Sequence, residues 1–218
     1  MNFDPSVFVV FPVLALSLVV HECAHGVMAL WNGDPTARDA GRITLNPLPH
    51  VDPLGSILLP GLLLLTRSPF LFGWAKPVPV DSSRLRHPPN DRVKVALAGP
   101  ASNILLALVF AALARLAPEQ GFWAPLRQMG LAGVVLNCAL AIFNLIPVPP
   151  LDGSWVLMRF LPLRHIIVLQ QFRFAGMALV FVVLSVPMVA NAVLYAPLRL
   201  AVRACLGLFG VVGGGIAL

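Results

Sequence analysis

The sequence predicts an all-α polytopic membrane protein that forms a single domain. Its 218 residues are 58% hydrophobic and only 11% charged, and the mean hydropathy is +0.87. Soluble domains usually carry about 25% charged residues. Runs approaching the roughly 20 apolar residues that cross a bilayer core fall at 6–31, 54–72, 93–116, 129–147, 166–190 and 192–212. We therefore expect about five or six membrane segments.

The first apolar run, 6–31, has no basic segment before it and leads directly into a polar motif. A secretory signal peptide begins with a positively charged region, so we expect this run to remain as a membrane helix.

The two gaps between the first and third apolar runs carry patterns typical of extended chain. "GRITLNPL" at 41–48 alternates in the β manner, among turn residues. "KPVPV" at 76–80 cannot be helical, and its prolines are typical of an edge segment. We expect short membrane-associated β-strands in these gaps.

The second apolar run, 54–72, allows two interpretations, because Pro60 and Gly61 either kink a spanning helix or mark a re-entrant hairpin. If the run spans the membrane, the runs 6–31 and 129–147 cross in opposite directions. If it is re-entrant, they cross in the same direction and their C-terminal ends lie at the same depth. We favour the re-entrant hairpin, with an external N-terminus.

No gap is long enough for a separate soluble domain, so residues 1–218 form one domain. Its core covers about 6–160, and accessory helices cover about 164–212. The net charge of +6 lies in short gaps between apolar runs, which is the positive-inside bias of membrane proteins and does not indicate nucleic-acid binding. The three cysteines lie in apolar segments without metal or redox spacing.

The motif "HECAH" at 21–25 places ionisable groups inside the first apolar run. His21 and His25 are four residues apart and lie on one helix face, from which both rings can reach one tetrahedral cation. Glu22 is rotated by about 100° and can reach a water on that cation, as in the HExxH motif of zinc hydrolases. A hydrogen-bonded polar cluster is the alternative, but ionisable groups at this depth are costly and mostly functional.

A zinc hydrolase site needs a third protein ligand. Asp152 is the acidic residue that directly follows an apolar run within a distinctive stretch, "FNLIPVPPLDGS" at 143–154, whose prolines exclude a continuous helix. Irregular backbone at membrane depth is tolerated against protein or a water-filled cavity. A solvated turn at a helix end is the alternative; beside a metal site short of one ligand, we favour ligation.

These motifs together resemble the site-2 protease family of intramembrane zinc metalloproteases. The matching pieces are "HECAH" at 21–25, "AGPASN" at 98–103 and "NLIPVPPLDG" at 144–153. "GRITLNPLPHVDPLG" at 41–55 and "GWAKPVPV" at 73–80 further resemble a compact branch without PDZ or CBS domains.

The resemblance implies one Zn²⁺ per chain, held by His21, His25 and Asp152, with Glu22 as general base. It also implies that Asn144 holds the substrate or the developing oxyanion. Asn103 would face the same core, either as a substrate-binding residue or in a structural interhelical hydrogen bond. The expected function is zinc-dependent endopeptidase cleavage of transmembrane substrates within the lipid bilayer; no oligomeric state is indicated.

Two other functions fit parts of the pattern: a metal-handling permease or sensor, and an inactive binding scaffold of the same fold. The ligand motifs favour the protease, because they cluster with a candidate base. The expected location is a prokaryotic cell (inner) membrane with the active site towards the cytoplasm. The re-entrant topology places on that side the basic residues Lys76, Arg84, Arg86, Arg92, Arg159 and Arg164.

Overall fold

The structure, a computed structural model, describes residues 6–66, 73–171 and 173–211. Its elements are α1 (Ser6–Trp31), α2 (Thr36–Asp39), the 3₁₀-helix η1 (Leu48–His50), the π-helix η2 (Pro53–Leu58), α3 (Leu59–Leu65), α4 (Pro88–Leu116), α5 (Ala124–Asn144), α6 (Gly153–Met158), α7 (Leu163–Gln171), α8 (Arg173–Leu184), α9 (Pro187–Ala190), the π-helix η3 (Asn191–Tyr195) and α10 (Ala196–Leu208). The prediction of an all-α protein is confirmed.

Within these residues, four helical stretches are long and apolar enough to cross a membrane: Val10–Trp31, Pro88–Leu116, Ala124–Asn144 and Pro187–Leu208. The pair α7 and α8, bent by 78°, makes a fifth if it counts as one span. This total roughly fits the expected five or six segments, and the protein is an integral membrane protein.

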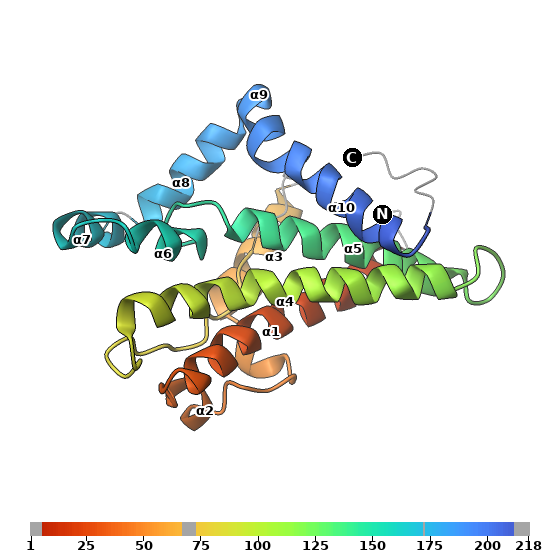
Figure 1. The fold of residues 1–218 in the computed structure, drawn as a ribbon. Helices are drawn as coiled ribbons and strands as arrows, with labels where there is room; N and C mark the ends of the chain where they lie inside the picture. Colours follow the sequence, from red (N-terminus) through yellow and green to blue (C-terminus); the bar gives the residue numbers. More distant parts are fainter. Residues whose placement is uncertain (1–5, 67–72, 172, 212–218) are drawn as a thin grey trace.

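Helices α1, α4 and α5 form the centre of the molecule (Figure 1). Small residues let α4 and α5 approach closely: a Cβ atom on Gly130 would lie 2.7 Å from the Ala114 backbone nitrogen, and one on Gly133 would collide with the Phe110 ring. Small residues at helix interfaces are typical of membrane proteins, where close van der Waals packing drives association. Helix α10 adds Val202 to the same apolar core. In Figure 1, α1 and α5 run in the same direction, and α4 runs the opposite way.

The predicted β-strands are wrong: the described part of the chain contains no strand. Residues 41–48 form turns that lead into η1, and the Thr44 carbonyl accepts the Cys23 thiol at 3.0 Å. The 73–80 segment is extended, but its backbone bonds to loops and side chains instead of a neighbouring strand. The Lys76 N–H donates to the His50 carbonyl, and Arg42 donates to the Lys76 carbonyl. The alternation in 41–48 therefore did not indicate a strand, and the prolines of 76–80 indicated an extended chain that pairs with no neighbouring strand among the described residues.

The second apolar run forms η2 and α3, and its apolar helix Pro53–Leu63 is shorter than a membrane span. Residues 67–72 of this run lie outside the described residues. The two ends of the run meet, because the Trp74 N–H donates to the Gly55 carbonyl at 3.2 Å and the Ser56 hydroxyl donates to the Trp74 carbonyl at 2.8 Å. Trp74, which follows the run, thus lies beside Gly55 at its beginning.

Candidate metal centre

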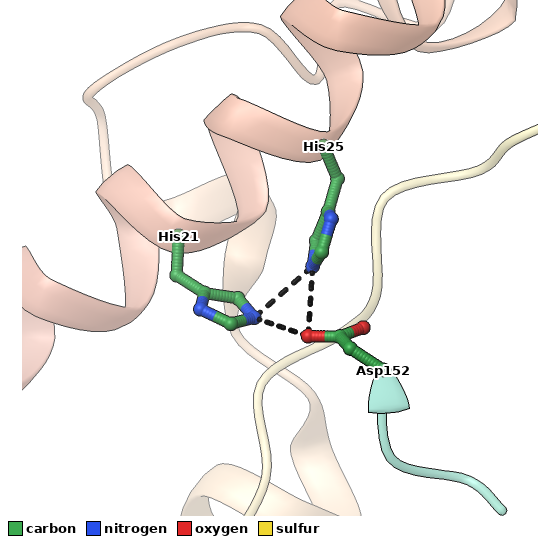
Figure 2. Close-up of side chains that lie close together, drawn as sticks. All are labelled: His21, His25 and Asp152. Atoms are coloured by element: carbon green, nitrogen blue, oxygen red, sulfur yellow. Dashed lines mark hydrogen bonds and ion pairs between the residues drawn. The ribbon is translucent and has the colours of Figure 1, made fainter. Parts of the chain in front are cut away.

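Three side chains from distant parts of the chain meet inside the helix bundle. His21 and His25 project from one face of α1, and Asp152 stands immediately before α6 (Figure 2). The two Nε2 atoms are 3.0 Å apart, and Asp152 Oδ2 lies 3.1 Å from His21 Nε2 and 3.4 Å from His25 Nε2. In the described part of the chain, this is the only group of three ligand-bearing side chains close enough to share one metal ion.

The hydrogen bonds behind the two histidines leave both Nε2 atoms free to bind a metal. His21 Nδ1 donates to Asn103 Oδ1 at 2.6 Å, and His25 Nδ1 donates to the Val95 carbonyl at 2.7 Å. Because each Nδ1 carries the proton in the neutral ring, each Nε2 presents a lone pair. This arrangement fixes the tautomer of metal-binding histidines in known metal sites.

The donor set fits a cation. Two imidazole lone pairs face the Asp152 carboxylate, and Asp152 Oδ2 is buried without a hydrogen bond. Three acceptors turned toward one point repel one another, and a buried carboxylate oxygen without a partner is costly. Two nitrogens and one carboxylate oxygen are the donor types that zinc takes in hydrolase sites, which leave one position open.

Gly99 of α4 packs directly against both imidazoles. A Cβ atom at this position would lie 2.5 Å from His25 Nε2 and 2.6 Å from His21 Nε2. Glycine therefore lets the α4 backbone form one wall of the metal centre.

The loop between α5 and α6 positions Asp152. As the prolines predicted, residues 145–152 are not helical; the loop turns on itself through the Leu151 N–H, which donates to the Val148 carbonyl at 3.0 Å. The Ser154 hydroxyl then donates to the Leu151 carbonyl at 2.6 Å. A Cβ atom on Gly153 would collide with the Leu145 carbonyl, so glycine lets the two ends of the loop close beside Asp152.

Glu22 lies next to the metal ligands on α1 and is half-buried. Its Oε2 atom accepts a 2.7 Å hydrogen bond from the Val78 N–H of the 73–80 segment. Within the residues that the structure describes, Oε1 has no hydrogen-bond partner. One oxygen of the carboxylate is thus held by the backbone, and the other is available for a proton.

The two asparagines singled out in the sequence have different surroundings. Asn103 is fully buried, and its amide donates to Asn137 Oδ1 at 2.9 Å and to the Ser17 carbonyl at 3.3 Å while its oxygen accepts from His21. Asn144, the last residue of α5, donates to the Leu140 carbonyl at 3.0 Å and makes no hydrogen bond to the metal ligands. The geometry therefore gives Asn103 the interhelical hydrogen bond, which was one of its two predicted roles.

Two residues of this network were not anticipated from the sequence. Asn137 is fully buried and donates to the Ser17 hydroxyl at 2.8 Å, which in turn donates to the Val13 carbonyl at 2.7 Å. The available signal was an asparagine within the apolar run 129–147, since a polar side chain at such a depth needs a hydrogen-bond partner.

Comparison with known proteins identifies the family. The chain is 36% identical over 205 residues to a Bacillus subtilis (strain 168) protein named putative zinc metalloprotease YwhC, covering 91% of this chain and 90% of that protein. The model of peptidase family M50 matches residues 115–187. The chain belongs to peptidase family M50.

Two further relatives of this M50 peptidase cover less of it. Putative zinc metalloprotease Rip2 of Mycolicibacterium smegmatis is 32% identical over 142 residues, which is 63% of this chain and 51% of Rip2. Putative zinc metalloprotease MJ0611 of Methanocaldococcus jannaschii is 41% identical over 69 residues, 32% of this chain and 35% of MJ0611. No solved structure matches the chain. The family match includes Asp152 but not the histidines.

Proposed function

We propose that this protein is a zinc-dependent intramembrane endopeptidase that cleaves membrane-spanning segments of other proteins. The observation that carries the proposal is the convergence of His21, His25 and Asp152 on one point, with Glu22 beside them on α1. Membership of family M50 supports peptide-bond hydrolysis, and relatives that carry zinc in their names support the metal. The cofactor is one Zn²⁺ per chain, held by two imidazoles and one carboxylate.

The chain's own residues supply the proton transfers. Bound zinc supplies a Lewis acid that lowers the pKa of water and polarises a carbonyl. Glu22 accepts the proton of the attacking water on Oε1 and passes it to the leaving nitrogen. The Val78 N–H holds Oε2, so the carboxylate is oriented before the substrate arrives. Asn144 has a second amide N–H besides the one bonded to Leu140, and we assign it to the developing oxyanion.

The 73–80 segment offers a backbone edge to an unwound substrate. A helical substrate must unwind, because its own amides are otherwise hydrogen-bonded. Trp74, Lys76 and Val78 use their backbone groups on the protein side of this segment. Among the described residues, the Ala75 N–H and C=O and the Pro77 C=O have no hydrogen-bond partner. An extended substrate can pair with these groups, as peptides do when they add to an exposed backbone edge.

The same geometry supports a membrane topology for the proposed protease. The parallel course of α1 and α5 and the meeting of Gly55 with Trp74 support a re-entrant 54–72 run. The site then lies towards the surface that carries the basic residues of the 73–92 gap, which is the cytoplasmic side. The membrane is a prokaryotic cell (inner) membrane.

A Glu22→Gln variant tests the proposed function. Glutamine keeps an oxygen that can accept the Val78 N–H but cannot serve as a base, so zinc should stay bound while peptide cleavage falls about 10²–10⁴-fold. The measurements are zinc content of the purified protein and appearance of cleaved membrane fragments in reconstituted vesicles. If the wild-type protein instead moves zinc across vesicles and cleaves nothing, it is a metal-handling protein. Binding of membrane segments with no cleavage by the wild type would indicate a scaffold.

A further inference from the structure

A cavity next to α4 and α6 is not used by the proposed chemistry. It measures about 340 Å³ and lies between the N-terminal end of α4 and the α6–α7 corner. Its lining combines two arginines with apolar side chains, among them Arg92, Arg159, Trp155, Met158, Leu161 and Ile166. Cavities that bind small molecules start at about 300 Å³ and have mainly apolar walls with a few fixed polar groups.

Both arginines are held in place by contacts that leave donors free. The Arg92 guanidinium lies 3.9 Å from the centre of the Trp155 ring, and a stacked guanidinium still presents its N–H groups at the edge. The Arg159 Nε atom donates to Asn90 Oδ1 at 2.8 Å, which leaves the terminal nitrogens of its guanidinium unbonded. The cavity is therefore lined by two oriented guanidinium groups that have hydrogen-bond donors free.

The positive charge of this cavity is not balanced by the described residues. Neither arginine forms an ion pair among them, and no acidic side chain lines the cavity. Asp91, the neighbour of Arg92, is bonded to Lys94 at 2.7 Å and to the His87 backbone. Two cations facing one partly apolar cavity repel each other, and an anion between them removes that cost.

The location of the cavity favours a membrane lipid. Helix α4 is one of the candidate spans, and Asp91, Arg92 and Lys94 in its first two turns mark the boundary between the apolar core and the headgroup layer. A phosphate can pair with the arginines while Met158 and Leu161 contact the glycerol and first acyl carbons. Basic pockets at this depth between membrane helices are suited to anionic lipid headgroups.

We propose that this cavity binds the headgroup of an anionic glycerophospholipid through its phosphate, held between Arg92 and Arg159. The cavity is lined by α4, which orients one metal ligand, and by α6, which directly follows another. Arg92 precedes by one helical turn Val95, whose carbonyl orients His25, and Trp155 lies in the helix that begins after Asp152. A bound lipid therefore braces α4, which orients His25, against α6, which begins directly after Asp152.

The test measures lipid binding, so it is independent of peptidase activity. The full-length protein in neutral detergent is titrated with phosphatidylglycerol or phosphatidylcholine, and bound lipid is counted by native mass spectrometry. The wild type should bind phosphatidylglycerol more tightly than phosphatidylcholine. Arg159→Gln, which keeps the Arg92–Trp155 stack, should weaken phosphatidylglycerol binding about 10-fold, and Arg92→Gln/Arg159→Gln should abolish the preference. Arg164→Gln, an exposed arginine of α7 outside the cavity, is the matched control and should bind like wild type.

Three results would overturn the proposal. The first is equal binding of the two lipids by the wild type, and the second is unchanged phosphatidylglycerol binding in a double variant that retains wild-type zinc content. The third is displacement of the lipid by millimolar inorganic phosphate or by an acidic peptide, which would assign the cavity to a free anion or to a substrate flank. Zinc content shows that each variant is folded, so a loss of lipid binding with zinc retained is specific to the cavity.

Discussion

Replacing Gly99 with alanine tests whether the α4 backbone sets the geometry of the metal centre. The new Cβ atom would lie 2.5 Å from His25 Nε2 and 2.6 Å from His21 Nε2, while ordinary contacts begin near 3.4 Å. The imidazoles or α4 must therefore move by roughly 0.9 Å, which is several times the ~0.2 Å tolerance of metal–ligand distances. We expect zinc affinity to fall at least 10–100-fold, as with loss of an outer-shell partner, and peptidase activity to fall with it.

The assay is zinc binding by competition with a chromophoric chelator, followed by peptide cleavage at saturating zinc. Gly207→Ala is the matched control, because Gly207 lies in α10 and a Cβ atom there would meet nothing within 4 Å. Alanine has a higher helix propensity than glycine, and Gly207 lies in the last turn of α10, so the control should be about as stable as the wild type. Wild-type zinc affinity and activity in Gly99→Ala would refute the close approach of α4 to the imidazoles.

Three further predictions follow from the site. Removing zinc with 1,10-phenanthroline should abolish cleavage and lower the melting temperature, with both restored by added Zn²⁺; a chelated enzyme that still cleaves would contradict the metal centre. Asn103→Ala should weaken zinc binding about 10–100-fold, because the His21 Nδ1–H loses its acceptor; unchanged affinity in a competition titration would show that the hydrogen bond does not orient the ring. Ala75→Pro removes an N–H that has no partner in the described structure and should lower kcat/KM for a membrane substrate at least about 10-fold with zinc retained. Ala75→Val keeps the N–H and should cleave like wild type, and equal activity of the proline and valine variants would exclude pairing at this edge.

Hydrophobicity alone predicted the long helices, because an apolar run of spanning length has few alternatives to a helix in a bilayer. The run 166–190 shows that composition does not predict where an apolar run is broken into separate helices. It is divided among α7, α8 and α9, with a 78° bend between α7 and α8, and α9 begins at Pro187. An apolar run indicates that a helix forms but not the angle at a break within it, so the bend was not predicted.

The β-strand prediction failed for a different physical reason. The prolines of 76–80 correctly indicated an extended chain, but a strand also needs a neighbour with a matching row of backbone groups. Pro77 and Pro79 have no N–H to offer. The backbone groups of Lys76 and Val78 bond to Arg42, to the loop at His50 and to Glu22, and none of these partners is a strand. The hydrogen-bond partners of an extended segment depend on tertiary packing, and the local sequence pattern does not specify them.

In the candidate site, too, local spacing was predictable from the sequence and tertiary contacts were not. The spacing of His21, Glu22 and His25 is local, so helix geometry alone predicted their shared face. Asp152 is distant in the sequence, and the signal for it is an acidic residue that directly follows an apolar run within a proline-rich, non-helical stretch. The structure brings the two together as that reasoning required, at 3.1 Å and 3.4 Å. The hydrogen bonds from His21 Nδ1 and His25 Nδ1 to α4 could not be predicted from the sequence, because they depend on how α4 packs against α1.

Helix α4 explains how two separate ligand segments are held at one depth. Its residues Val95, Gly99 and Asn103 follow each other at four-residue intervals and so share one face. The first and third orient the two imidazoles through the Val95 carbonyl and the Asn103 oxygen, and the second leaves room for both rings. One turn earlier, Arg92 of the same helix stacks on Trp155, beyond Asp152. A single helix face therefore contacts both ligand segments, so the distance between the histidines and Asp152 is set by α4 and not by the direct packing of α1 against α6.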